Sequence, residues 1–305
     1  MEKHPSATIF DTAAHLWDRA SDFDVVVVAS PNRTHVPLAL EALAAELNVV
    51  VDKPLALTAS EGRKLIDAAR KRGRMLTVFQ NRRWDGDFLT VQRLLKEDAL
   101  GSPLRFESRF ERWRPVPKPG WRESGKPEEA GGLLYDLGSH LIDQALLLFG
   151  PASSVYAEMD RRRPSVEVDD DSFVAITHAS GVRSHLFMSA VAAQLGPRFR
   201  VLGSRTAYVK YGLDVQEAAL RDNLGLDSTG FGHDPRDAWG TLGSGSDTKL
   251  IPTEVGSYQR FYEGVVAALI GAAPPPVDPA DAVAGLEVIE AARRSATDGR
   301  VIAMG

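Results

Sequence analysis

The sequence predicts an α/β fold: a parallel sheet in the first hundred residues, then an α+β domain with a large, mostly antiparallel open sheet. Short β-branched runs alternate with amphipathic helical segments up to about residue 100, a pattern typical of right-handed βαβ units. After Gly101-Ser102-Pro103 the segments become longer and alternate with period two, which indicates antiparallel pairing. A chain of 305 residues with 44% hydrophobic content can form two cores. We therefore expect domains at 1–100 and 101–305.

The first domain is expected to contain four strands alternating with four helices. Val25-Val26-Val27-Val28 is apolar without alternation, which predicts a strand covered on both faces. The expected strands are Ala7–Phe10, Val25–Ala29, Val49–Val51 and Met75–Phe79. The expected helices are Thr12–Ala20, Val36–Leu47, Ser60–Arg72 and Phe88–Asp98.

The second domain is expected to combine alternating strands with two late helices. Its expected strands are Leu104–Trp113, Ser154–Met159, Ser172–His178, Arg183–Ala190, Phe199–Leu202 and Thr206–Tyr211. Residues 223–256 are rich in Gly, Ser, Asp and Thr and show little periodicity, which predicts a long loop region. The helices Tyr258–Ile270 and Pro279–Thr297 are expected on either side of the turn at Pro274-Pro275-Pro276.

Composition argues against several classes of protein. The net charge of −5 argues against a nucleic-acid-binding surface, so we interpret Arg161-Arg162-Arg163 as a solvated turn. With no cysteine, a disulfide framework, a thiolate nucleophile and a cysteine-ligated metal are impossible, and the composition fits a reducing cytoplasm. The early apolar run Val25–Ala29 is too short to span a membrane. We predict a cytoplasmic protein with no nucleic-acid or membrane partner.

Lys53 is the first candidate functional residue. It follows the apolar strand Val49–Val51 and Asp52, so it lies at the carboxyl end of a parallel strand, where ligands bind in open α/β sheets. Pro54 disfavours helical geometry at Lys53 and holds it in an extended turn. The alternative is an ordinary solvated lysine in a strand-to-helix loop.

Asp136 and His140 are the second candidate pair. They stand four residues apart in a helical segment that is entered through Gly131-Gly132, so they lie on one face of the helix. The rest of the helix is rich in leucine, and a polar pair on it indicates that this face meets something polar. A buried hydrogen-bonded or capping pair is the alternative. A metal site is not expected, because no further histidine or carboxylate stands at a short offset to complete a zinc set.

Polar side chains follow two other expected strands. Ser30-Pro31-Asn32 and His35 come after Val25–Ala29, where Ser30 and Asn32 can cap exposed amides and His35 is expected to face the crevice. Gln80 to Asp85 comes after Met75–Phe79 and places polar and aromatic groups at the same edge.

The glycine-rich loop of a dinucleotide-binding fold is missing from the sequence. Such a fold opens with a strand, G-x-G-x-x-G and a helix, whose glycines let backbone amides approach the pyrophosphate. The first glycine here is Gly62, and Gly243-Ser244-Gly245 lacks both the third glycine and the strand-to-helix context.

From about residue 7 to the end, the chain resembles the Gfo/Idh/MocA family of NAD(P)-dependent oxidoreductases. Its Ser/Thr-Pro-x-x-x-His motif corresponds to Ser30, Pro31 and His35, and its Glu/Asp-Lys-Pro motif to Asp52, Lys53 and Pro54. Its Gly-Gly-x-x-x-Asp-x-x-x-His motif corresponds to Gly131, Gly132, Asp136 and His140. The segment Phe79–Asp85 looks most like the branch with NADP-linked scyllo-inositol dehydrogenases.

The resemblance implies a Rossmann-like dinucleotide-binding domain followed by a substrate-binding and oligomerisation domain, and hydride transfer between nicotinamide C4 and a sugar or polyol carbon. By analogy His140 takes the hydroxyl proton, Asp136 orients the imidazole, and Lys53 stabilises the developing alkoxide. The implied cofactor-binding residues are Ser30, Pro31, Asn32, His35, Asp52, Lys53, Asn81 and Arg82. The implied substrate contacts are Trp84, Trp121 and Arg122. The family's open second sheet implies a homodimer or homotetramer.

The departure from the family is at the amino terminus, where the first strand, glycine turn, helix and second strand are absent, a unit of ~30 residues or more. Three explanations compete: a start inside a longer gene, a removed segment, or a truncated paralogue. We favour an incomplete record of a working enzyme, because losing these strands exposes a sheet edge.

The alternatives are a cofactor-free sugar-binding or regulatory pseudoenzyme and a chain that folds poorly alone. The resemblance slightly favours NADP, but the position that reads the ribose 2′ group follows the absent strand, so NAD stays open.

Overall fold

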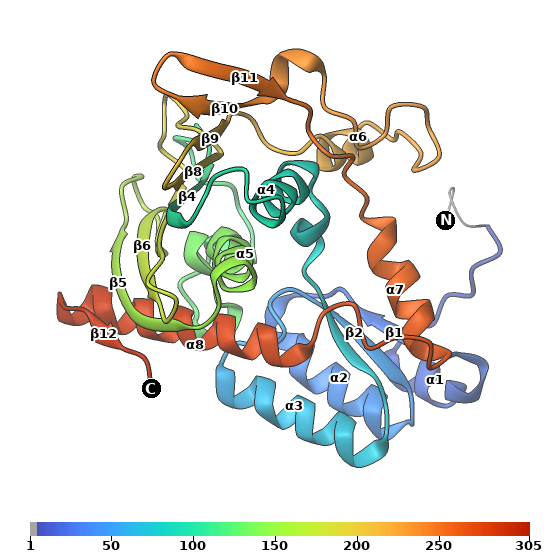
Figure 1. The fold of residues 1–305 in the computed structure, drawn as a ribbon. Coiled ribbons are helices and arrows are strands. Elements are labelled where there is room, and N and C mark those ends of the chain that lie inside the picture. Colours follow the sequence, from blue (N-terminus) through green and yellow to red (C-terminus); the bar gives the residue numbers. More distant parts are fainter. Residues whose placement is uncertain (1–4) are drawn as a thin grey trace.

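The computed structural model describes residues 5–305, so the first four residues of the expected first domain lie outside the described residues. Two sheets organise the chain, as Figure 1 shows. The first consists of three parallel strands in the order β1 (Val25–Val28), β2 (Asn48–Asp52) and β3 (Leu76–Phe79). The second has nine strands and is mostly antiparallel. This arrangement confirms the predicted fold class.

Helices α2 (His35–Ala44) and α3 (Ala59–Arg72) cover one face of the parallel sheet (Figure 1). Local sequence fixes both ends of α3. Thr58 and Glu61 form a reciprocal capping box at its start, and Gly73 ends it with the left-handed φ of 60° that glycine adopts without strain.

Two expectations for the first domain are wrong. Ala7–Phe10 pairs with no strand in the described chain, and the helix that follows it is the short α1 (Ala13–Trp17). An apolar run becomes a strand only when a neighbour accepts its backbone hydrogen bonds, and Ile9 is 63% exposed. The strand β1 is also not covered on both faces, because it lies at the sheet's edge and Val27 is 45% exposed.

The nine-stranded sheet contains the six strands expected after residue 100. Their bounds are β4 (Pro103–Glu111), β5 (Ala152–Asp160), β6 (Asp171–His178), β7 (Arg183–Ser189), β8 (Phe199–Gly203) and β9 (Ala207–Lys210). Strands β4 and β7 pair in parallel, whereas the other neighbours pair antiparallel. The short β12 (Ile302–Ala303) completes one edge beside β5.

The expected loop at residues 223–256 is wrong over its second half. There, β10 (Gly240–Ser244) and β11 (Asp247–Ile251) form a hairpin that extends the sheet beyond β9. Gly245-Ser246 makes the turn, with Gly245 at a left-handed φ of 57°. A glycine in a two-residue turn is a known hairpin signal, but Gly240 and Gly243 within β10 hid the alternation of that strand. A short helix, α6 (Gln216–Arg221), precedes this region.

The remaining helices connect the two sheets. Helices α4 (Gly86–Lys96) and α5 (Ser139–Phe149) lie between them, and α8 (Pro279–Asp298) runs from the parallel sheet to the large one (Figure 1). Helix α7 (Gln259–Leu269) returns to the parallel sheet, where Phe261 packs on Phe79 with ring centroids 4.9 Å apart. Residues near the end of the chain, in α7 and α8, therefore pack against the parallel sheet.

Among the described residues, every helix is too short or too polar to cross a membrane. The cytoplasmic location stays a prediction.

Candidate active site

Lys53 lies where the sequence placed it, one residue beyond β2. The Lys53-Pro54 peptide bond is cis, and the lysine side chain is 14% exposed. Its ammonium donates to the backbone carbonyl of Asp136, and its Nζ lies 3.1 Å from Asp136 Oδ1. The carboxyl end of a first-domain strand and a segment of the second domain thus meet through one ion pair.

The segment that carries Asp136 and His140 is not one regular α-helix. A π-helical turn over Leu134–Gly138 leads into α5. Asp169 holds the start of this turn, because its Oδ2 accepts a hydrogen bond from the Leu134 amide at 2.8 Å. Gly132 has φ +98°, and a Cβ at that position would lie 1.9 Å from Asp169 Oδ1. The second glycine of the motif is therefore required by the approach of Asp169.

The expected pairing of Asp136 with His140 is not found. No hydrogen bond joins them in the described structure; instead the Asp136 carboxylate contacts Lys53 and the Arg122 guanidinium, whose Nε lies 3.3 Å from Oδ1. A carboxylate gains more from two full positive charges than from a neutral imidazole. The Nδ1 atom of His140 is buried and has no hydrogen-bond partner among residues 5–305.

Charge and burial set the protonation states of this pair. Burial and the nearby charges of Lys53, Arg82, Arg198 and Arg112 hold the pKa of His140 well below its usual range. Burial opposes ionisation of Asp136, but the Lys53 ammonium and then Arg122 lower the pKa of its carboxyl. At neutral pH the site therefore contains a neutral imidazole beside an ionised carboxylate.

A cavity of about 750 Å³ connects these groups. Lys53, Asp136 and His140 all line it, so the cation, the carboxylate and the imidazole face one space. Other lining residues are Asp52, Phe79, Asn81, Arg82, Arg112, Arg114, Arg122, Leu137, Glu217, Leu220, Arg221, Leu226, Tyr258, Gln259 and Tyr262.

A smaller neighbouring cavity of about 180 Å³ lies against the end of β1 and shares four residues with the large one. Five of the residues expected to bind cofactor line it, and so do both expected substrate contacts of the segment after Gly120. These are Ser30, Pro31, Asn32, Asp52, Lys53, Trp121 and Arg122. The two cavities follow the carboxyl ends of successive parallel strands.

His35 does not face the crevice, contrary to expectation. It is 1% exposed, and its ring nitrogens lie 2.8 Å from the Pro54 carbonyl and 2.9 Å from the Ser30 carbonyl. The buried ring ties together the loops that follow β1 and β2. His35 therefore supports the shape of the site without lining either cavity.

The segment after β3 divides its residues between the cavity and the interior. Asn81 and Arg82 line the large cavity, but Trp84 lines neither cavity and packs edge-on against Phe261 with centroids 5.6 Å apart. The 3₁₀ turn Asn81–Trp84 directs the indole away from the crevice, so the expectation of a substrate contact at Trp84 is wrong.

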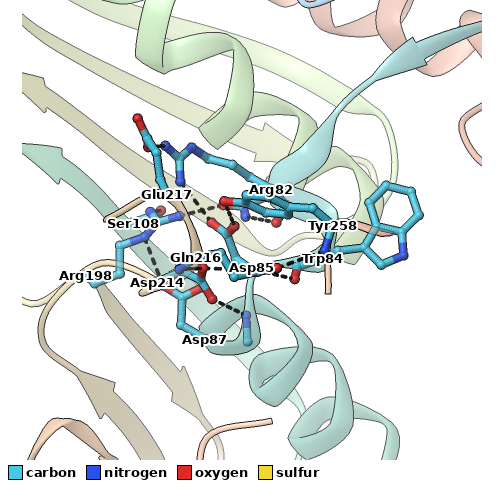
Figure 2. Close-up of polar contacts among 12 residues, drawn as sticks. Arg82, Trp84, Asp85, Asp87, Ser108, Arg198, Asp214, Gln216, Glu217 and Tyr258 are labelled. Carbon is cyan, nitrogen blue, oxygen red and sulfur yellow. Dashed lines mark hydrogen bonds and ion pairs between the residues drawn. The ribbon is translucent and has the colours of Figure 1, made fainter. Parts of the chain in front are cut away.

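Arg82 belongs to a buried polar network, drawn in Figure 2. Its guanidinium pairs with Asp85 at 3.2 Å and with Glu217 at 2.6 Å. Tyr258 donates its hydroxyl to Asp85 at 2.8 Å (Figure 2). Burial raises the pKa of Asp85 well above its usual range, and burial and the charge of Asp87 raise that of Asp214 to about 6. The network fixes Arg82 at the floor of the cavity.

Sequence reasoning missed several lining residues. Arg112 and Arg114 had a usable signal, since they stand two residues apart at the end of the expected strand Leu104–Trp113 and so share a face. Glu217, Tyr258 and Tyr262 had none, because α6 and α7 reach the cavity only through the return of the chain to the first sheet.

Comparison with known proteins places this geometry in a family. Residues 3–80 match the Gfo/Idh/MocA model described as "Oxidoreductase family, NAD-binding Rossmann fold", and residues 92–304 match the model for its "C-terminal alpha/beta domain". The uncharacterised oxidoreductase YdgJ of Escherichia coli is 40% identical over 96% of this chain and 84% of its own length.

Two further proteins extend the comparison. The scyllo-inositol 2-dehydrogenase (NADP(+)) IolW of Bacillus subtilis is 34% identical over 92% of this chain and 78% of its own length. The solved structure of the oxidoreductase yvaA from Bacillus subtilis superposes with a TM-score of 0.94 at 32% identity, covering 100% of this chain and 87% of that one.

Proposed function

This chain belongs to the Gfo/Idh/MocA oxidoreductase family, and on that premise we propose that it transfers a hydride between a nicotinamide cofactor and a hydroxyl-bearing carbon of a sugar or cyclic polyol. The single observation that carries the proposal is the shared cavity of Lys53, Asp136 and His140. The name of the similar IolW supports a polyol as substrate. Family membership favours this function over a cofactor-free binding protein.

We assign the following roles to the catalytic residues. His140, neutral because its pKa is lowered, accepts the proton of the substrate hydroxyl as a general base. The Lys53 ammonium stabilises the negative charge that develops on the substrate oxygen. Asp136 positions Lys53 through its carbonyl and its carboxylate, rather than orienting the imidazole.

The strand-end residues fit a nicotinamide dinucleotide. Ser30 and Asn32 offer a hydroxyl and an amide at the small cavity, Asn81 offers an amide at the large one, and Lys53 lies at both. The buried Nδ1 of His140, which has no partner among the described residues, also leaves a polar atom for a ligand. When bound, such a cofactor supplies the hydride acceptor or donor. We propose NADP over NAD, because IolW is named as NADP-linked.

The first test is turnover. The protein is incubated with scyllo-inositol, myo-inositol, a series of aldoses, D-glucuronate or D-glucose 6-phosphate and either NAD⁺ or NADP⁺, and formation of reduced nicotinamide is followed by absorbance. We expect reduction with at least one of these compounds and a higher kcat/KM with NADP⁺. Mixtures without the sugar or polyol are the control. If neither cofactor is reduced across the panel, the proposed function is rejected.

We also propose that the protein forms a homodimer or homotetramer through the outer face of the nine-stranded sheet. Positions along β6 alternate between fully and partly buried, which leaves one face of the strand incompletely covered. On that face Phe173 and Phe187 pair across strands with ring centroids 4.9 Å apart, and the Arg109 guanidinium lies 4.2 Å from the Phe187 ring.

Sedimentation equilibrium tests the assembly. We expect a mass that is a multiple of the 33.1 kDa protomer, and a shift toward the protomer mass in Phe187→Glu, because a buried carboxylate opposes association. Ile270→Glu, which replaces an exposed apolar residue just beyond the end of α7, is the matched control outside the nine-stranded sheet. A monomeric wild-type protein would contradict the proposal.

A further inference from the structure

Arg112 and Arg114 continue β4 beyond its last residue in extended geometry. Their amides donate to the carbonyls of Ser189 and Ala190, both at 2.8 Å. Side chains alternate along extended backbone, so the two arginines project to the same side, opposite the 57% exposed Trp113. Both line the large cavity.

Neither guanidinium forms an ion pair or a side-chain hydrogen bond among residues 5–305. The Arg112 guanidinium lies 4.7 Å from the centre of the Phe110 ring, and the carboxylates of Asp136 and Glu217 attract it without forming an ion pair with it. The other arginines of the cavity are paired: Arg82 and Arg221 with Glu217, and Arg122 with Asp136. Two cations that line this cavity thus lack a direct ion-pair partner among the described residues.

The cavity is therefore positive within an acidic protein. Six cationic side chains and three carboxylates line it, although the whole chain has a net charge of −5. Burial and the neighbouring Arg114 lower the pKa of Arg112 to about 10. Partly burying two like charges costs desolvation and mutual repulsion, and an anion bound between them offsets both costs.

We propose that the substrate carries an anionic group, a carboxylate or a phosphate, which Arg112 and Arg114 bind while the reacting alcohol lies at Lys53 and His140. The inference rests on the proposed function and narrows its substrate class to sugar acids or sugar phosphates. Two guanidinium forks on one face suit the oxygen atoms of either group.

The position of the arginines favours the substrate over the cofactor phosphates. Both belong to the second domain and are absent from the lining of the small cavity, where Ser30, Pro31 and Asn32 lie. The proposed anion site thus lies outside the small cavity, where Ser30 and Asn32 are proposed to bind the dinucleotide.

The test uses three probes that differ only at C6: D-glucose, D-glucuronate and D-glucose 6-phosphate. Their binding is measured by calorimetry with and without NADPH. We expect at least one anionic probe to bind roughly 10- to 100-fold more tightly than glucose, the range for charge-assisted hydrogen bonds. Comparing D-glucuronate with D-glucose 6-phosphate shows whether the site prefers a carboxylate or a phosphate. The preference should weaken as the salt concentration is raised.

Variants assign the preference to the two residues. In Arg112→Gln and Arg114→Gln the advantage of the anionic probe should fall, and the double variant should lose it. Arg112→Lys keeps the positive charge but loses the planar guanidinium group, so it should retain part of the tighter binding of the anionic probe. Arg72→Gln removes an exposed cation at the end of α3, away from the cavity, and should change nothing.

Three results would overturn the inference: equal binding of the three probes, including no binding by any; a preference that survives in the double variant; or variants that weaken NADPH binding instead. The proposed function fails separately. If the anion preference is found but neither nicotinamide is reduced with any substrate, then the function is wrong and the anion site stands.

Discussion

Replacing Lys53 with methionine is expected to lower kcat/KM for oxidation of the sugar or polyol by about 100- to 1,000-fold. This is the effect of removing one donor that stabilises an oxyanion. The ammonium lies 3.1 Å from Asp136 Oδ1 and lines the shared cavity, so it can approach the oxygen that loses its proton. Negative charge on that oxygen appears only as the reaction proceeds. The loss should therefore fall mainly on kcat rather than on KM.

The matched control is Lys64→Met, which removes an exposed lysine from α3 and should leave both constants unchanged. Steady-state rates and a thermal melting curve are measured for both variants, since methionine keeps most of the side-chain volume. Because Asp136 acts by positioning Lys53, adding Asp136→Asn to Lys53→Met should lower the rate little further. Wild-type turnover in Lys53→Met, or full additivity in the double variant, contradicts these roles.

Replacing His140 with asparagine is expected to lower kcat by about 100- to 10,000-fold, the usual contribution of a positioned general base. Burial and then the charges of Lys53, Arg82, Arg198 and Arg112 hold the imidazole neutral, so the wild-type rate should stay high below pH 6.5. It should fall only as the pH drops through the lowered pKa of His140. The pH profile of kcat/KM measures this fall in rate at low pH, and His140→Asn should not show it.

The same shift has a consequence for stability. In the unfolded chain a histidine binds a proton below pH 6.5, whereas buried His140 stays neutral until a lower pH. As the pH falls between these two values, the unfolded state binds more protons, so His140 makes the wild-type protein less stable. The raised pKa of Asp214, about 6, acts in the opposite direction.

The difference between wild type and His140→Asn isolates the histidine, because Asp214 is present in both. Urea unfolding at several pH values should show wild type losing stability relative to the variant as the pH is lowered below 6.5. His185→Asn, a partly buried histidine on β7, serves as the control for turnover. If His140→Asn keeps the wild-type kcat and the same fall of kcat/KM at low pH, His140 is excluded as the base.

Local sequence patterns were enough to predict most strands and the position of Lys53. Period-two and apolar runs predicted strands β1 to β9, and the chain direction of parallel strands put Lys53 at the ligand edge. The spacing of Asp136 and His140 brought both to one cavity. These predictions succeeded because they depend on backbone geometry over a few residues.

Which charges meet depends on how distant segments pack together. Asp136 pairs with Lys53 and Arg122 instead of His140, Trp84 packs against Phe261, and Arg112 forms no ion pair among the described residues. Each outcome depends on distances between segments far apart in the chain. Electrostatic energy follows spatial separation and burial, which periodicity does not encode.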